Sequence, residues 1–290
     1  ILGDVSVQVE GGSCTDTLNG ANQENTWELA QNTGAYPHQL NTTVEFAAFE
    51  NLVGNAAVDT FYLNSETLNG LSISGDDPTN ISTSTDVLTA RFDASATWTI
   101  QNDDASTTAI EANQVASGGN VVAFTNIETI NAVDGSAATV EDTFNINAAN
   151  TVVTINARNG DDNFNIEASI TTLNGGDGAD TFTLEDVVAD VATIDGQGGS
   201  DTLTISDTTG YTQANWEFDA TPSVNFVNVS TSVGGLNDFD VEIVNASTLV
   251  DDVDISERSV DQFNARSGDD IVDILGDVSV QVDGGSGTDT

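Results

Sequence analysis

Residues 159–184 read NGDDNFNIEASITTLNGGDGADTFTL, and this stretch decides the fold. It contains two short segments, DNFNI at 162–166 and DTFTL at 180–184, in which apolar residues alternate with Asn or Thr. Alternation with a period of two is typical of a strand that buries one face. The segment recurs as DTFNI at 142–146 and DTLTI at 201–205. The leading aspartates are therefore 20, 18 and 21 residues apart (142 to 162, 162 to 180, 180 to 201).

A second series of strand-like segments lies between those of the first, as VVTINA at 152–157, ITTLNG at 170–175 and VATIDG at 191–196. Two strands per 18–21 residues, repeated in register, predict coils that stack about 4.8 Å apart around one apolar column. We therefore expect an all-β fold, a right-handed parallel β-solenoid with loop insertions and no helix longer than two turns. The expected strands are 143–146, 152–156, 164–166, 171–174, 182–184 and 192–195. The side chains expected to point inward are Phe144, Ile146, Val153, Ile155, Phe164, Ile166, Leu173, Phe182, Leu184 and Ile194.

The two ends of the chain carry nearly the same sequence. Residues 1–17 read ILGDVSVQVEGGSCTDT and residues 274–290 read ILGDVSVQVDGGSGTDT, which is 15 identities in 17 positions. The differing positions are Glu10/Asp283 and Cys14/Gly287. The offset of 273 residues (274 minus 1) indicates a tandem repeat. We expect residues 1–290 to be one continuous solenoid unit, followed by the start of the next, cut from a longer array.

A larger module recurs three times, and each copy contains one of the three tryptophans. The modules lie approximately at 16–63, 86–146 and 201–255. They differ in length, so we expect inserted residues to protrude from the coils as loops. The expected loops are 31–44, 102–120 and 220–237.

The charge balance excludes some partners. The chain has 4 Lys and Arg residues against 47 Asp and Glu residues, a net charge of −43. Nucleic acid is excluded because its phosphates need clustered basic side chains, and anionic membrane surfaces would repel the chain. Self-repulsion also opposes compaction. Since 38% of the residues are hydrophobic, we expect a folded protein that depends on cations or salt. With Cys14 as the only cysteine, no intrachain disulfide can form.

Glycine–aspartate turns join the expected strands. Residues 175–183 read GGDGADTFT and fit the pattern G-G-x-G-x-D-x-U-x, in which U is a large apolar residue. Residues 284–289, GGSGTD, fit as far as the chain goes, and residues 11–18, GGSCTDTL, fit except at Cys14. Looser versions of the pattern lie at 159–162, 196–201 and 267–270. These turns resemble the calcium-binding RTX, or haemolysin-type, repeats of secreted bacterial proteins. The resemblance covers 159–205 and the junction of 268–290 with 1–18. It departs from the family because the pattern appears about once per coil instead of in direct tandem.

The resemblance implies a Ca2+ cofactor held between neighbouring coils. Calcium takes six to eight oxygen ligands, which aspartates and the carbonyls of glycine turns can supply. The alternative is that these residues form turns only, since Asn, Asp and Gly dominate tight corners without any metal. The candidate ligands are Asp16, Asp161, Asp162, Asp177, Asp180, Asp195, Asp201, Asp269, Asp270, Asp283 and Asp289.

The tryptophan modules are similar to repeats of very large bacterial adhesins and exoproteins. This similarity implies a structural, non-enzymatic repeat of a secreted surface or filament protein, located outside the cell. Its expected partners are neighbouring repeats of the same protein, in end-to-end and in lateral contacts. A polysaccharide-processing β-helix enzyme and an ice- or carbohydrate-binding solenoid are the alternatives. Arg158 and Arg266, in NARNGDD and NARSGDD, are expected to pair with neighbouring aspartates, and His38 is expected to have no functional role.

Overall fold

The computed structural model divides the chain into two compact units. Unit 1 comprises Ile1–Asp142 and Asn150–Arg158, and unit 2 comprises Thr143–Ala149 and Asn159–Thr290. The structure describes residues 7–31, 34–75, 85–101, 113–134, 140–148, 152–185, 190–206, 212–218, 222–228, 231–236, 239–256, 260–275 and 279–290. These residues form strands and connections and no helix, so none of them builds an apolar helix of membrane-spanning length.

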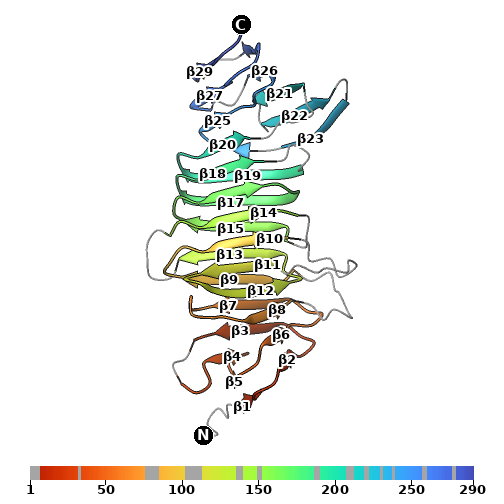
Figure 1. The fold of residues 1–290 in the computed structure, drawn as a ribbon, viewed down its shortest axis with the longest axis vertical. Coiled ribbons are helices and arrows are strands. Elements are labelled where there is room, and N and C mark those ends of the chain that lie inside the picture. The colour runs from red at the N-terminus through yellow and green to blue at the C-terminus, as the bar shows by residue number, and fades with distance from the viewer. Residues whose placement is uncertain are drawn as a thin grey trace. The chain divides into compact units, whose positions relative to one another are not determined.

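Unit 1 is built from short strands (Figure 1). They are β1 (Val7–Glu10), β2 (Thr17–Asn19), β3 (Asn25–Leu29), β4 (His38–Leu40), β5 (Val44–Ala47), β6 (Asn51–Val53), β7 (Asp59–Leu63), β8 (Leu71–Ser74), β9 (Val87–Phe92), β10 (Thr97–Ile100), β11 (Asn113–Ser117), β12 (Asn120–Thr125), β13 (Thr129–Asp134) and β15 (Thr154–Asn159).

Unit 2 continues the same strand pattern and contains the stretch from which the fold was predicted. Its strands are β14 (Thr143–Ile146), β16 (Asn163–Ile166), β17 (Ile170–Gly178), β18 (Thr181–Leu184), β19 (Asp190–Gly199), β20 (Thr202–Ile205), β21 (Gln213–Phe218), β22 (Ser223–Asn228), β23 (Thr231–Leu236), β24 (Phe239–Asp240), β25 (Ile243–Asn245), β26 (Val250–Ile255), β27 (Gln262–Asn264), β28 (Ile271–Ile274) and β29 (Gln281–Asp283).

Most strand pairs are parallel, and their registers confirm the predicted all-β solenoid. Thr143 lies opposite Asn163, Asn163 opposite Thr181, and Thr181 opposite Thr202. These partners are 20, 18 and 21 residues apart, the spacing of the repeated segments. All six predicted strands are present, with β17 and β19 extending through the Gly-Asp turn at their C-terminal ends.

An apolar column fills the interior of the parallel coils. Phe144 stacks on Phe164 and Phe164 on Phe182, with ring centroids 4.8 and 4.6 Å apart and planes inclined by 12°. Identical side chains meet because parallel partners in register place equal positions one above another. The inward positions were predicted correctly with one exception: Val153 is 39% exposed. It precedes β15, and its neighbour Val152 is buried instead.

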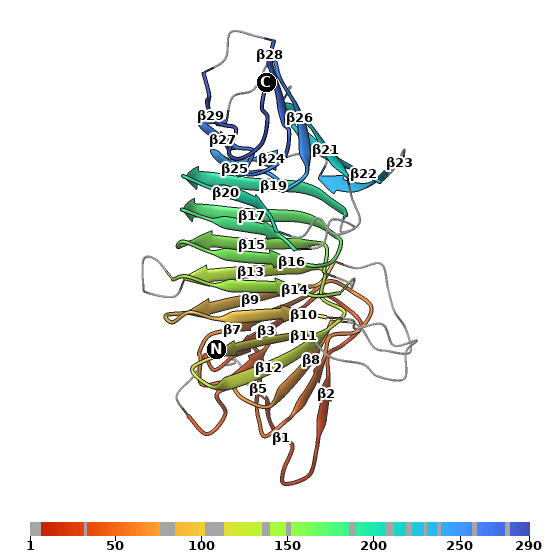
Figure 2. The same ribbon diagram turned by 45° about the horizontal axis from the view of Figure 1, so that its top comes forward.

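The expected loops around the tryptophans are instead antiparallel strands inserted into the sheets. Each insertion is a three-stranded meander: β3–β4–β5, β10–β11–β12 and β21–β22–β23. Figure 2 shows the third meander beside β26. The prediction of protruding loops was therefore wrong at 38–40, 113–117, 223–228 and 231–236. The remainder of the second loop, 102–112, lies outside the described residues.

The meanders leave the parallel direction of the sheet unchanged. The strand order is β1-β5-β4-β3-β7. The first strand of the meander, β3, therefore pairs with β7 of the next coil, and β4 and β5 lie between β3 and β1. The third meander repeats this arrangement between β19 and β26. Because the chain reverses twice, β5 runs parallel to β1 and β3 runs parallel to β7. Trp27, Trp98 and Trp216 all lie on the first strand of their meander.

Candidate functional site: the carboxylate ladders

Acidic residues placed directly before parallel strands connect successive coils of unit 2. The Asp162 N–H donates to Asp180 Oδ1 at 2.8 Å, and the Asp180 N–H donates to Asp201 Oδ1 at 2.8 Å. The Asp201 N–H in turn donates to Glu242 Oε2 at 2.7 Å. We call this series, and its counterparts below, a carboxylate ladder. A carboxylate that accepts a backbone N–H forms a charge-assisted hydrogen bond, worth about 1.5–3 kcal/mol.

Further carboxylate ladders follow the same rule. In unit 2 the Asp251 N–H donates to Asp270 Oδ1 at 2.9 Å, and the Asp270 N–H to Asp289 Oδ1 at 3.3 Å. Unit 1 has the donor–acceptor steps Asp59 to Asp86, Asp86 to Glu128 and Asp16 to Glu50, at 2.7, 2.7 and 2.9 Å. Acceptance of the backbone N–H of the preceding coil is thus a general property of these acids.

Each meander is bracketed by one step of a ladder. Asp16 and Glu50 enclose the first meander, and Asp86 and Glu128 enclose the second. The third lies between Asp201 and Glu242. In all three cases a glutamate, not an aspartate, accepts the N–H at the far side of the insertion. The tryptophan modules therefore share this bracketed meander as well as one sequence pattern, although the second meander lies in the 13-stranded sheet and the other two lie in the 16-stranded sheet.

Glycines five residues before the aspartates make room for the carboxylates. A Cβ on Gly175 would lie 2.1 Å from Asp180 Oδ2, and one on Gly196 would lie 2.3 Å from Asp201 Oδ2. No side chain can occupy those positions while the carboxylate is there. The Gly-x-x-x-x-Asp spacing of the turn motif is therefore explained by packing of the carboxylate against a bare backbone.

Burial perturbs the acids of the ladder in unit 2. Asp180 and Asp201 are 0% and 1% exposed, and the Oδ2 atom of each has no hydrogen-bond partner. Burial raises the pKa of Asp180 to about 6. The hydrogen bond from the Asp162 N–H acts in the opposite direction, and repulsion from Asp201 and Asp161 adds to the rise. Burial likewise raises the pKa of Asp201 to about 6, with Glu242 and Asp195 adding to it. Burial therefore disfavours the ionised form of each carboxyl group and favours its protonated form.

A tryptophan lies beside a buried aspartate in the first and third modules. Trp216 Nε1 donates to Asp251 Oδ1 at 2.9 Å, and Ser247 Oγ donates to the same oxygen at 2.8 Å. Burial still raises the pKa of Asp251 to about 6. Asp59 has the same register relative to Trp27, two residues before the residue that pairs with the tryptophan.

Asp59 is the most perturbed of these acids. It is 0% exposed and neither carboxylate oxygen has a hydrogen-bond partner of good geometry. Burial raises its pKa to about 7, although the Asn25 amide and the Trp27 indole lie near enough to lower it. Repulsion from Asp86 adds to the rise.

The predicted calcium ligands fall into two classes. Asp162, Asp180, Asp201 and Asp270 are buried, and they belong to the ladders. The others are exposed or half-buried, and several accept backbone N–H groups of the turns: Asp161 from Ala179 at 2.8 Å, Asp195 from Gln197 at 3.1 Å, Asp269 from Thr288 at 2.9 Å and Asp283 from Gly285 at 3.0 Å. Asp177 completes this second class together with Asp16 and Asp289, which also take part in ladder steps.

In Asp180, a member of the buried class, Oδ1 accepts the Asp162 N–H and Oδ2 lies close to Gly175. In the described part of the chain, no three His, Cys, Asp or Glu side chains converge closely enough to hold a metal. Calcium binding by either class stays a prediction.

Several ladder residues escaped the sequence-based assignment: Glu50, Asp59, Asp86, Glu128, Glu242 and Asp251. Four of them directly precede a strand, and that position could have identified them from the sequence. The other two, Asp59 and Asp251, are the first and second residues of their strands. Arg266 was predicted to pair with aspartates, but its Nη1 donates to the Ile205 and Ala246 carbonyls at 2.8 and 3.5 Å. The ion pair found among the described residues joins Arg91 Nη1 to Glu28 Oε2 at 3.4 Å. Arg158 therefore forms no ion pair with a described acid.

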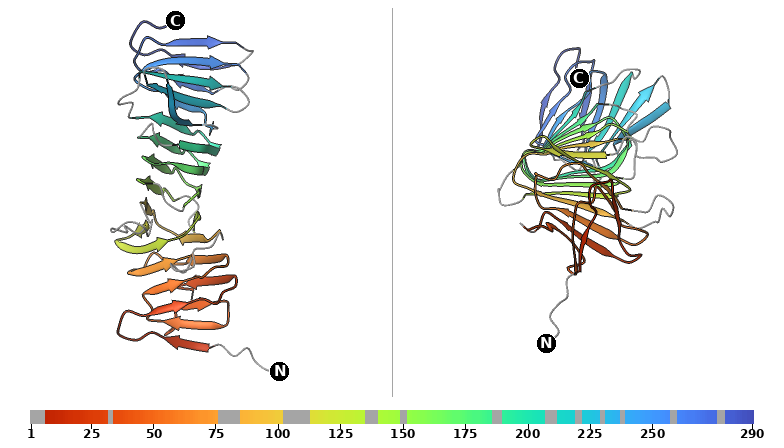
Figure 3. Two further views of the ribbon diagram at one scale, coloured as in Figure 1. Left: turned by 90° about the vertical axis from the view of Figure 1, so that its right-hand side faces the viewer. Right: turned by 60° about the horizontal axis from the view of Figure 1, so that its bottom comes forward.

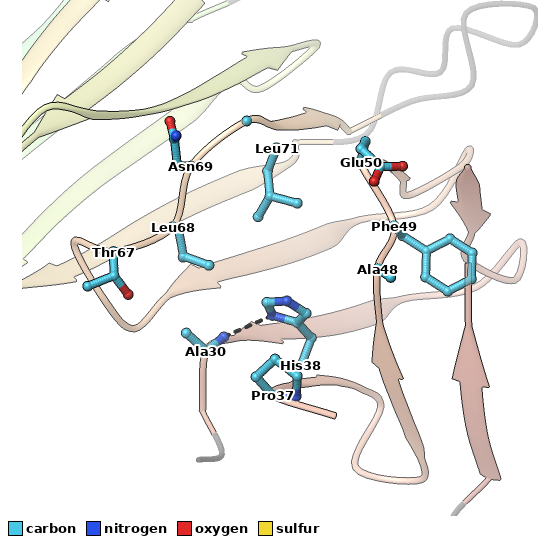
Figure 4. Close-up of a pocket in the computed structure, with 11 residues that line it drawn as sticks. Ala30, Pro37, His38, Ala48, Phe49, Glu50, Thr67, Leu68, Asn69 and Leu71 are labelled. Carbon is cyan, nitrogen blue, oxygen red and sulfur yellow. Dashed lines mark hydrogen bonds between the residues drawn. The ribbon is translucent and has the colours of Figure 1, made fainter. Parts of the chain in front are cut away.

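His38 lines a mixed polar and apolar cavity of about 370 Å³ in unit 1 (Figure 4). Its Nδ1 accepts the Ala30 N–H at 3.1 Å, and its ring lies 5.1 Å from Phe46. Burial lowers the His38 pKa. Its hydrogen bond stabilises the first turn of the meander.

No protein-family model and no curated protein matches this chain.

Proposed function

We propose that this chain is a structural repeat of a long extracellular bacterial surface or filament protein, which serves as a spacer or building block. The observation that carries the proposal is the ladder, in which the backbone of each coil donates to a carboxylate of the next. A structure of this kind grows in one dimension, with each coil stabilised mainly by its neighbours. The 273-residue repeat in the sequence extends this principle from successive coils to successive repeats.

The negative charge suits a surface role. A net charge of −43 on 290 residues keeps such rods apart at low salt and lets screening or cations bring them together. Two forms of the function follow, a stalk that holds a binding tip away from the envelope and a filament whose lateral contacts build a sheath.

The ice-binding alternative receives little support from the outward threonines. Thr181 pairs with Thr202 and Thr183 with Thr204, but the next strands place Asn163 and Asn165 on one side and Ile243 and Asn245 on the other. A Thr-x-Thr array two coils long is too short to match a crystal face.

Electron microscopy of the parent protein tests the proposal. We expect unbranched rods whose length grows in equal steps with the number of 273-residue repeats. Isolated rods would indicate a stalk, and ordered bundles would indicate a filament. Compact particles whose length does not follow repeat number would contradict the proposal.

A further inference from the structure

One of the two sheets presents an outer surface without charge in unit 2. The strands of the 13-stranded sheet stack there as successive rungs (Figure 3), and each directs two side chains away from the apolar column. We call the outward residues of β14, β16, β18, β20, β25 and β27 the uncharged face. They are Thr143, Asn145, Asn163, Asn165, Thr181, Thr183, Thr202, Thr204, Ile243, Asn245, Gln262 and Asn264.

The strands that unit 1 contributes to the same sheet follow the same rule. Their outward residues are Thr17, Asn19, Asn51, Val53, Ser72, Ser74, Thr97, Thr99, Gln114, Ala116, Val121, Ala123 and Thr125. Among all the described strands of this sheet, Asp283 of β29 is the one charged residue.

The 16-stranded sheet differs, although it belongs to the same coils. Its outward positions carry acids and an arginine in both units: Glu28, Glu45, Arg91, Glu217, Asp252, Asp254 and Asp273. The chain has 47 Asp and Glu residues to distribute over its surface. The lack of charge is therefore a property of one sheet and not of the whole chain.

Acidic residues border the uncharged face in unit 2, directly beyond the ends of its strands. Asp161 lies two residues before β16, and Glu167 and Glu185 follow β16 and β18. Protein interfaces have this composition, since charged residues are depleted at their centre and collect at a polar rim.

Side chains on the uncharged face bind one another along the row. Asn165 Nδ2 donates to Asn145 Oδ1 at 2.8 Å, and Asn264 Nδ2 donates to Asn245 Oδ1 at 2.7 Å. Asn245 Nδ2 in turn donates to Thr204 Oγ1 at 3.1 Å. Such rows of amides accompany the dry interfaces between stacked sheets. A face whose polar groups are already paired and ordered loses less on leaving water.

The charge of the chain decides which partner suits this face. Each copy carries a net charge of −43, so two copies repel least where their uncharged faces meet. A polysaccharide is the competing partner, and small-molecule sites are commonly lined with aromatic side chains. The aromatic rings on the described strands of this sheet point inward instead. All are 0% exposed: Trp98, Phe124, Phe144, Phe164, Phe182 and Phe263.

We propose that the uncharged face of one copy packs against the same face of a second copy of this chain. The inference rests on the structural function proposed above and names the surface that its lateral contacts use. Six strands about 4.8 Å apart, each exposing about 13 Å of its length, give about 400 Å² per partner in unit 2. A contact of this size is weak by itself, and tandem repeats multiply it. Because both copies use the same face, the contact closes as a pair.

Sedimentation velocity of the full chain tests the pairing, at concentrations up to about 1 mM and in about 1 M NaCl to screen the acidic rim. We expect a monomer–dimer equilibrium. Thr183→Asp places a charge at the centre of the face, between Asn165 and Thr204, and should weaken dimerisation about tenfold or more.

Thr172→Asp is the matched control. Thr172 is half-buried like Thr183 and lies on a parallel strand of unit 2, but that strand, β17, belongs to the 16-stranded sheet. The control adds the same charge to the chain and should leave dimerisation unchanged. Equal weakening by both variants would overturn the pairing, as would a chain that stays monomeric at the highest concentration while keeping its β spectrum.

Thiol protection gives a second measurement that does not require a charge on the sheet. Cys14→Ser removes the natural thiol, and Thr183→Cys or Thr172→Cys then places one thiol on either sheet. Alkylation of the thiol at 183 should slow several-fold between about 10 μM and about 1 mM protein. Alkylation at 172 should not change. A rate at 183 that is independent of concentration would contradict the pairing.

Electrophoresis through a gel that contains a neutral polysaccharide, dextran, tests the competing partner. We expect no retardation of the full chain. Retardation that Thr183→Asp abolishes would show that the face binds glycans and would overturn the choice of a second copy. Failure of the pairing leaves the stalk form of the proposed function intact, because rod length in microscopy depends on repeat number alone.

Discussion

Trp216 and Asp251 form a buried hydrogen-bonded pair, in which the indole Nε1 lies 2.9 Å from Oδ1 of the carboxylate. The tryptophan is on the first strand of a meander, and the aspartate precedes the tryptophan's strand partner Val253 by two residues. The pair joins the inserted meander to the ladder, because the Asp251 N–H donates to Asp270. The tryptophan thus has a structural role in the coil interior.

Trp216→Phe should destabilise unit 2 by about 1–3 kcal/mol, because it removes one of the donors to a buried carboxylate while keeping an aromatic ring. Chemical unfolding at pH 8 measures the change. Trp216→Phe combined with Asp251→Asn is the control, and we expect the double variant to recover part of the loss. A purely apolar role for the indole would make the double variant at least as unstable as the single one.

Asp180→Ala and Asp180→Asn should have different effects on stability. The alanine variant leaves the Asp162 N–H without its acceptor and should cost about 1–3 kcal/mol. The asparagine variant keeps an acceptor oxygen and removes a buried charge, so we expect stability at pH 8 to be unchanged or higher. Equal losses in both variants would contradict the ladder.

The chain should become more stable as pH falls from about 8 to about 5. Burial raises the pKa of Asp59 to about 7 and the pKa of Asp180, Asp201 and Asp251 to about 6, from a usual 3.8. A carboxyl with a raised folded-state pKa binds its proton more tightly when folded, so folding gains as pH drops through that value. The gain ends near the unfolded-state pKa.

Melting temperatures at several pH values in high salt measure this dependence, since screening suppresses the contribution of the net charge. The variant Asp180→Asn/Asp201→Asn should flatten the profile. An unchanged slope in that variant would assign the effect to surface charge instead.

Removal of calcium at fixed high ionic strength should leave the melting temperature unchanged if the buried ladders alone hold the coils together. The Oδ1 atoms of Asp180 and Asp201 already accept N–H groups, and their Oδ2 atoms are enclosed. A clear drop on addition of a chelator would instead support the calcium site predicted from the Gly-Asp turns. Asp161→Asn with Asp177→Asn would then locate it among the exposed carboxylates.

Gly175→Ala should destabilise unit 2 by about 1–3 kcal/mol, because its Cβ would lie 2.1 Å from Asp180 Oδ2. Gly34→Ala is the matched control, since nothing lies within 4 Å of a Cβ there. Thermal unfolding compares the two. A neutral Gly175→Ala variant would show that the carboxylate can move aside without loss.

Much of the parallel solenoid could be predicted because the coils between 142 and 205 repeat in both length and alternation. In-register stacking aligns equal residues, so Phe144, Phe164 and Phe182 had to share one column once the strands were placed. The meanders could not be predicted in this way. Their strands pair with sequence neighbours running in the opposite direction, and nothing in HQL at 38–40 distinguishes such a strand from a loop.

The candidate site divides in the same manner. The aspartates of the turns were visible in the sequence as a motif, but the motif leaves open whether a carboxylate faces a cation or a backbone N–H. That choice depends on which group the neighbouring coil presents, a matter of register. Glu50, Glu128 and Glu242 belong to the ladders because the meanders bring them beside Asp16, Asp86 and Asp201.

By itself, the sequence determined the strand period, the inward apolar positions, the 273-residue repeat and the acidic surface, since each depends only on residue type and spacing. The tertiary structure alone decided where the chain folds back into a meander and which atoms the buried carboxylates bind. For the carboxylates, the physical reason is that their partners lie 18 to 42 residues away, as in the ladder steps from Asp162 to Asp180 and from Asp86 to Glu128. For the meanders, the strands pair with near sequence neighbours, and no residue type in those segments marks them as strands instead of loops. No local pattern specifies which backbone N–H will arrive beside a given carboxylate.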